Sequence, residues 1–151
     1  MFFKDLVAKL SEESGLDLEP DIYDTCMLER DGIVISFKYQ QESDDIAIFA
    51  PVTDPDKIVR LNESALRIAL SLCYNGVGTG GCFIGLFEEN LVLTRYVPLK
   101  DLSVEKFAAI LNAFGETAYD VHNAIIAAYQ DIPATVSSQG NEKMLEHGLS
   151  V

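Results

Sequence analysis

The residues with the clearest potential for chemistry form the glycine-rich stretch Gly76–Gly81, which matches the dinucleotide-binding pattern G-x-G-x-x-G. In a nucleotide site, such a loop follows a strand and opens a helix, so that phosphate meets the positive end of the helix dipole. Here the predicted order is helix, loop, strand, which would present the negative end. Cys82 also stands where a P-loop has lysine. The stretch therefore predicts a tight connection using positive φ angles, not a nucleotide site.

Other reactive side chains give little support for catalysis or metal binding. The two histidines, His122 and His147, are distant in sequence, and no Cys-x-x-Cys occurs, so no set has the spacing of metal ligands. The adjacent acids Glu88 and Glu89 are typical of a solvated hairpin tip. We therefore expect no catalytic residue, no metal and no cofactor.

Composition and charge favour a cytosolic protein that binds neither nucleic acid nor membranes. The chain has 151 residues, the size of one domain, and a net charge of −13. Such acidity argues against phosphate backbones and anionic lipid surfaces. Three cysteines, Cys26, Cys73 and Cys82, make no disulfide framework, and their apolar neighbours predict inert, reduced core thiols. We expect no cleaved signal peptide at Met1–Asp5, and no apolar run approaches the ~20 residues of a membrane span.

The first half of the chain predicts one helix and three strands. In residues 2–14, apolar side chains recur at helical spacing and Gly15 follows as a stop. Residues 25–30 and 33–39 read as strands around Asp31-Gly32, a strong hairpin signal. A third strand is expected at 46–52.

A second helix is expected from Asp54 to about Tyr74, beginning with a cap and a proline at the first helical position. Its apolar arc is wide enough to make two faces. One face carries Ile58, Leu61, Ala65, Ile68 and Leu72, and the other carries Val59, Leu66, Leu70 and Cys73. Such a helix is covered twice, by its own sheet and by something else.

The second half predicts strands at 82–87 and 91–97 and a long helix at about 104–130, capped by Ser103. The order α-βββ-α-ββ-α indicates an α+β domain with a mainly antiparallel twisted sheet and helices packed on it. We expect this domain to span residues 1–132. The polar segment 133–151 reads as a flexible C-terminal tail.

Several stretches together resemble the class I type III secretion chaperones, of which the Tir chaperone is typical. The resemblance covers about Phe3 to Tyr129 and rests on fold-type positions rather than on a catalytic signature. The most telling stretch runs from Leu72-Cys73-Tyr74-Asn75 into Gly78–Leu86. The resemblance implies a non-catalytic homodimer that binds the N-terminal segment of a secreted effector in the bacterial cytosol. It also implies that the segment is held extended, by strand addition and apolar pockets.

The residues predict where these contacts lie. The second apolar face of the 54–74 helix, Val59, Leu66, Leu70 and Cys73, is the expected dimer interface, since a two-fold interface brings one face against itself. The sheet strands carry apolar residues on both sides, although one side of such a sheet is commonly wet. We therefore expect Val34, Ala47 and Phe49 to bind the effector segment.

Three alternatives stay open at this stage. The chain could be a regulatory or sensory protein-binding domain of the same fold, with no link to secretion. It could also be a small enzyme that uses the glycine loop. Finally, Val34 and Phe49 could be scattered surface residues, because folded proteins expose many apolar atoms. A binding site should instead form one contiguous patch.

Overall fold

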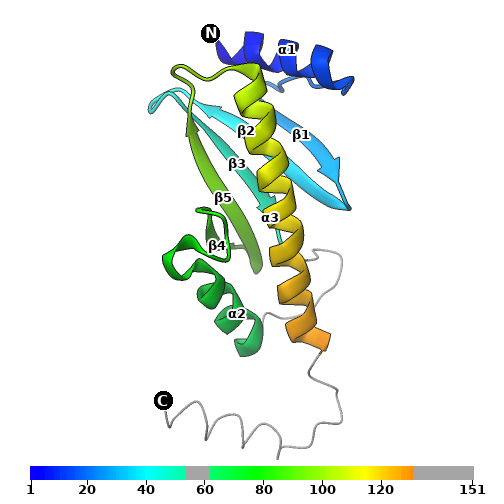
Figure 1. The fold of residues 1–151 in the computed structure, drawn as a ribbon, viewed down its shortest axis with the longest axis vertical. Coiled ribbons are helices and arrows are strands. Elements are labelled where there is room, and N and C mark those ends of the chain that lie inside the picture. The colour runs from blue at the N-terminus through cyan, green and yellow to red at the C-terminus, as the bar shows by residue number, and fades with distance from the viewer. Residues whose placement is uncertain (54–61, 131–151) are drawn as a thin grey trace, which may run out of the picture.

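The computed structural model describes residues 1–53 and 62–130, as three helices, a short 3-10 turn and five strands (Figure 1). The order confirms the predicted α-βββ-α-ββ-α arrangement. The helices are α1 (Phe3–Ser14), α2 (Glu63–Cys73) and α3 (Val104–Gln130). The strands are β1 (Thr25–Arg30), β2 (Ile33–Gln40), β3 (Asp45–Pro51), β4 (Phe83–Phe87) and β5 (Asn90–Pro98).

The five strands form one antiparallel sheet in the order β1-β2-β3-β5-β4. The first three strands form a meander, and the β4–β5 hairpin joins it through β5. Asp31 and Gly32 both have positive φ in the turn between β1 and β2, as the hairpin signal predicts. Strands β1 and β4 are therefore the two edges of the sheet.

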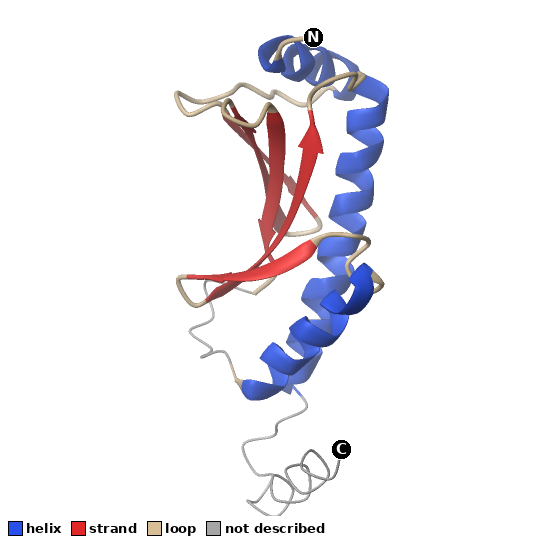
Figure 2. Cartoon of the chain, turned by 90° about the vertical axis from the view of Figure 1, so that its left-hand side faces the viewer, coloured by secondary structure: helices blue, strands red, loops and turns tan. Residues whose placement is uncertain are grey.

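The helices cover one face of this sheet, which we call the inner face, and the outer face carries no described helix (Figure 2). Helix α3 runs along the inner face, α1 lies near its first turns, and α2 contacts both α3 and β4 (Figure 1). Strand alternation sends Ile35 and Phe37 of β2, and Ile46 and Ile48 of β3, into the core, where each is almost fully buried. The predicted split between the two sheet faces is thus confirmed.

Helix α3 has the clearest pattern in the sequence, and its described stripe is buried as expected. That stripe comprises Phe107, Leu111, Phe114, Ala118, Val121 and Ile125. Phe107 meets Phe37 edge-on, with ring centroids 5.4 Å apart, so the helix and the middle of the sheet share one core.

The second helix differs from its prediction. Residue Asn62 is extended (φ −95°, ψ 167°) and its side-chain oxygen accepts a hydrogen bond from the N–H of Ala65 at 2.8 Å. One continuous helix from Asp54 is therefore wrong, because Asn62 is itself a favourable N-cap that starts a new helix at Glu63. The predicted start at Asp54 and the predicted interface residue Val59 lie outside the described residues, as does the boundary proposed after residue 132.

Candidate protein-binding surfaces

The outer face of the sheet carries a continuous row of side chains across all five strands. The register places Met27, Ser36, Phe49, Thr94 and Phe83 side by side in that order, and we call this set the outer row. Met27 is 67% exposed and Phe83 is 47% exposed, while Phe49 between them is partly exposed. Apolar side chains with exposed surface therefore lie at both sheet edges and in the middle of the row, with the buried Ser36 and the partly exposed Thr94 between them.

A second row lies beside the first, two residues along each strand. It consists of Thr25, Lys38, Ala47 and Tyr96. Tyr96 is half exposed, and its ring lies 5.7 Å from that of Phe83, centroid to centroid. The aromatic pair thus links the two rows on the outer face.

The three predicted effector-binding residues differ in how much surface they offer. Val34 and Phe49 lie on the outer face with part of each side chain exposed. Ala47 lies on the same face by register but is buried, because it is small and its strand neighbours are Lys38 and Tyr96. Sequence alternation found this face, but it missed Met27, Phe83 and Tyr96, because only the register shows that they share it.

A second apolar surface lies at the corner formed by α2 and β4. Leu66 and Leu70 of the predicted interface are 37% and 74% exposed, and Cys73 is partly buried. Leu86 pairs with the buried Leu91, so it lies on the inner side of the sheet, where α2 contacts β4, yet it is 61% exposed. The other face of α2, with Ala65 and Ala69, is buried in the core. The wide apolar arc predicted for this helix is thus real, and one half of it lies uncovered.

A third feature, which we call the edge hollow, lies beside strand β1. It has a volume of about 270 Å³ and is formed by four segments: α1, the loop after it, the β1–β2 hairpin and α3. Its apolar lining includes Leu10, Leu16, Leu18, Leu28, Ile35 and Leu111, while Arg30 and Asn112 also line it. Sequence reasoning missed this hollow because its walls come from distant parts of the chain.

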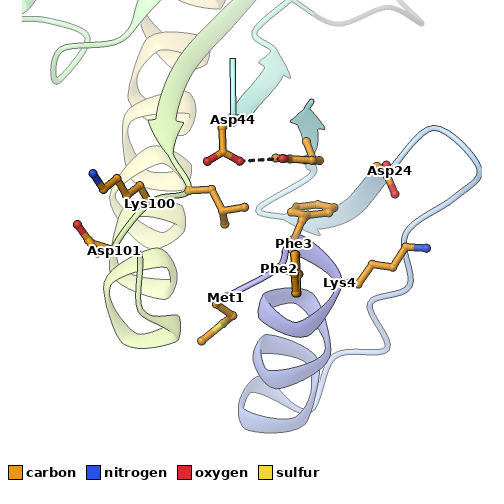
Figure 3. A pocket seen from close by; sticks show the side chains of 10 residues that line it. Met1, Phe2, Phe3, Lys4, Asp24, Asp44, Lys100 and Asp101 are labelled. Atoms are coloured by element: carbon orange, nitrogen blue, oxygen red, sulfur yellow. Dashed lines mark hydrogen bonds between the residues drawn. The ribbon is translucent and has the colours of Figure 1, made fainter. Parts of the chain in front are cut away.

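A larger hollow of about 600 Å³ lies at the start of α1 (Figure 3). Phe3 stacks on Tyr39 there, and the Tyr39 hydroxyl donates a 2.7 Å hydrogen bond to Asp44. That hydrogen bond raises the pKa of Tyr39 above its ordinary value. Lysines and aspartates share the lining, so the hollow has no single charge preference.

The buried thiols of Cys26 and Cys82 are poor nucleophiles. Burial, with a smaller effect of Asp21 and Asp24, raises the pKa of Cys26 to about 11. Burial also raises the pKa of Cys82, although nearby Arg95 acts in the opposite direction. Among residues 1–53 and 62–130, no group of three or more His, Cys, Asp or Glu side chains is placed to hold a metal ion.

The glycine loop connects α2 to β4, which is the helix–loop–strand order expected from the sequence. Gly76, Gly80 and Gly81 have positive φ angles, as a tight connection requires. Gly78 is needed for space instead, because a Cβ there would lie 2.7 Å from Cδ2 and 2.9 Å from Cα of Leu72. The Thr79 hydroxyl donates to the Cys82 carbonyl at 2.6 Å and closes the loop.

Comparison with known proteins agrees with this architecture. The sequence pattern of the Tir chaperone protein (CesT) family matches residues 5–121, most of the chain. The chain belongs to this family. It is a chaperone family rather than an enzyme family, and the resemblance inferred from the sequence is confirmed.

Solved structures show the same fold at low sequence identity. The ExsC–ExsE complex matches with a TM-score of 0.64 and 21% identity, over 76% of this chain and 86% of that one. The HopA1–SchA chaperone–effector complex matches with a TM-score of 0.61 and 18% identity, over 80% and 93%. YbjN from E. coli matches with a TM-score of 0.50 and 14% identity, over 85% and 95%. No curated protein matches the sequence. None of the described helices is long and apolar enough to cross a membrane.

Proposed function

We propose that this protein is a type III secretion chaperone that acts in the bacterial cytoplasm. It binds the N-terminal segment of a secreted effector and keeps that segment soluble and extended. Membership of the Tir chaperone family and the fold shared with a chaperone–effector complex support this proposal. The observation that carries it is the set of exposed apolar side chains on the outer face, where Met27, Phe83 and Tyr96 are each about half exposed or more.

The proposed effector surface combines two ways of holding an extended chain. The outer row and the Phe83–Tyr96 pair offer apolar contacts to alternate side chains. Strand β1 offers a sheet edge with no strand partner among the described residues. A segment paired with β1 would gain main-chain hydrogen bonds, and its inward side chains would enter the edge hollow. Main-chain pairing tolerates many sequences, while the hollow selects apolar side chains.

The proposed homodimer is built on the corner of α2 and β4. Leu66, Leu70 and Leu86 are exposed there, and each would lose contact with water in a two-fold interface. The apolar surface already belongs to a structured helix and strand, so dimerisation orders little additional chain. A second copy is the occupant that suits such a self-complementary apolar corner, and Cys73 would lie at its margin.

The test is capture of effector segments from the native cytosol by the parent protein and a double variant, Val34→Asp with Phe49→Asp. We expect the parent to co-purify with the N-terminal part of a secreted protein and to protect it from protease, and the variant to lose both. The matched control is Gln41→Asp with Asn123→Asp, which adds the same charge at exposed positions outside the patch. Equal capture by the variant and the parent would show that the outer face is not the site.

A further inference from the structure

Arg30 ends strand β1 and is held in one position against helix α3. Its Nη1 donates to the Asn112 carbonyl at 2.9 Å and to the Asn112 side-chain oxygen at 3.2 Å. One turn further along α3, Gly115 leaves the space that the arginine crosses. A Cβ at that position would lie 2.9 Å from Cδ and 3.1 Å from Nη1 of Arg30. The guanidinium is therefore fixed before any partner arrives.

The opposite edge of this guanidinium keeps hydrogen-bonding capacity. Its Nε lies 3.6 Å from Asp31 and its Nη2 lies 3.8 Å from Glu116, both longer than a hydrogen bond. Both contacts are long ion pairs, and within the described residues neither nitrogen donates a hydrogen bond. The side chain is one third exposed (33%) and lines the edge hollow. Two parallel N–H donors are thus presented at the rim of the hollow.

A strand added to the edge of β1 would need such donors where β1 ends. After Arg30 the chain turns away through Asp31 and Gly32, with φ of 53° and 78°. An added strand that continues past this point has no further main-chain partner on β1. Its next carbonyl would then lie unpaired beside an apolar hollow, which is costly unless another donor is near.

We propose that Arg30 donates from Nε and Nη2 to a main-chain carbonyl of the bound segment, at the point where that segment passes the end of β1. This role rests on the proposed function, because it assumes a segment paired with β1. It makes Arg30 the residue that sets the register of the segment relative to the edge hollow.

The local charge favours a neutral acceptor over a carboxylate. Asp31 and Glu116 flank the single positive charge of Arg30, and the whole chain carries −13. An acidic side chain brought to this rim would be repelled by these two carboxylates. A carbonyl brings no net charge and still uses both donors.

The first experiment measures binding of two short peptides by nuclear magnetic resonance titration. One is an acetylated and amidated strand of alternating threonine and leucine, which carries no charge, and the other has one threonine replaced by aspartate. We expect Arg30→Lys to weaken both peptides by about tenfold, since lysine cannot present two parallel donors. The Arg30 Nε–H signal of the parent should shift on binding. The matched control, Arg67→Lys on the exposed side of α2, should leave both affinities unchanged.

The outcomes separate this role from the proposed function. Equal binding by Arg30→Lys and the parent overturns the role of Arg30 and leaves effector capture by the outer face intact. If Arg30→Lys loses affinity only for the aspartate peptide, Arg30 binds an acidic side chain and its assignment to a main-chain carbonyl is overturned. If the parent binds neither peptide, the added strand at β1 is contradicted, and the role of Arg30 with it.

A second variant guards against misfolding of Arg30→Lys. Gly115→Ala keeps the arginine but fills the space it crosses, and alanine is the better helix former in the interior of α3. We expect its thermal midpoint to stay near that of the parent while the affinity for both peptides falls about tenfold. Unchanged affinity in Gly115→Ala would show that the fixed position of the guanidinium does not matter, and would overturn the proposal.

Discussion

The two faces of the sheet carry apolar side chains from the same strands, but only one face is covered. On the inner face, Phe37 and Ile48 have no exposed surface, because α3 lies over them. On the outer face, Met27 and Phe83 keep about half of their surface or more in water. The inner side chains are explained by the fold of one chain, whereas the outer ones are not. The difference between the faces thus separates residues that build the domain from residues that the fold of one chain leaves partly in water.

The same contrast recurs along helix α2. Ala65 and Ala69 lie in the core, while Leu70, one position further on, is 74% exposed. Ile68 and Leu72 are partly buried against the same core. Leu66 and Leu70 instead face outward, which is the reverse of what a solvated helix face needs. This arrangement supports the proposed dimer, since the larger apolar side chains are those whose removal from water stabilises most.

The largest expected effect comes from comparing one phenylalanine on each face. Phe37→Ala should lower the free energy of unfolding by about 3–5 kcal/mol, because it removes a ring packed against Phe3 and Phe107. Phe83→Ala on the outer face should cost less than ~1 kcal/mol. Urea unfolding of both variants at one protein concentration measures the difference. Similar losses of unfolding free energy in the two variants would mean that the outer face is also part of the folded core.

The next largest effect is expected at the proposed dimer interface, the corner formed by α2 and β4. Leu70→Asp should raise the dimer dissociation constant at least ~100-fold, about 2.7 kcal/mol, by burying an unpaired charge in the interface. Ser71→Asp, next to it on the polar side of α2, adds the same charge and should leave the dimer intact. Sedimentation over a range of concentrations measures both. A monomeric parent at micromolar concentration would disprove the dimer itself.

One glycine of the α2–β4 connection and one glycine of β4 predict a smaller contrast. Gly78→Ala should cost about 1–3 kcal/mol, because the new Cβ meets the backbone of Leu72, which cannot easily move. Gly85→Ala, in β4, meets nothing within 4 Å and should be neutral or stabilising by up to ~1 kcal/mol. Thermal unfolding distinguishes the two. If Gly78→Ala is as stable as the parent, the loop does not pack as described.

The local elements could be predicted from the sequence because their signals are local. The strand at 25–30 matches the structure at both ends, and the helix predicted from 104 begins there, since the Asp31-Gly32 turn and a regular apolar stripe define them. The start of α2 could not be predicted, because Asp54-Pro55 and Asn62 are two competing helix starts and local pattern does not rank them.

The candidate sites could be predicted only in part, for a different reason. Alternation places Val34 and Phe49 on one face, and helical spacing places Leu66 and Leu70 on another. Phe83 lies in the same row as Phe49 only because β5 pairs with both β3 and β4. Arg30 contacts Asn112, which is 82 residues further along the chain. Such contacts depend on strand order and register, which a single sequence does not encode as a periodic signal.

The last predicted effect is a loss of stability at alkaline pH that depends on the buried side of β1. Cys26 pairs with Phe37 and is buried, and its pKa is raised from an ordinary 9.0 to about 11. The folded protein therefore keeps a proton that the unfolded chain releases above pH 9. The free energy of unfolding should be unaffected by this thiol below about pH 9 and should fall as the pH rises through 11. Urea unfolding between pH 8 and pH 11 measures this slope, to which Tyr39 and Cys82 contribute in the same direction. Cys26→Ala should flatten the slope relative to the parent. An identical slope in Cys26→Ala and the parent would show that the thiol on the covered face is not held protonated by its burial.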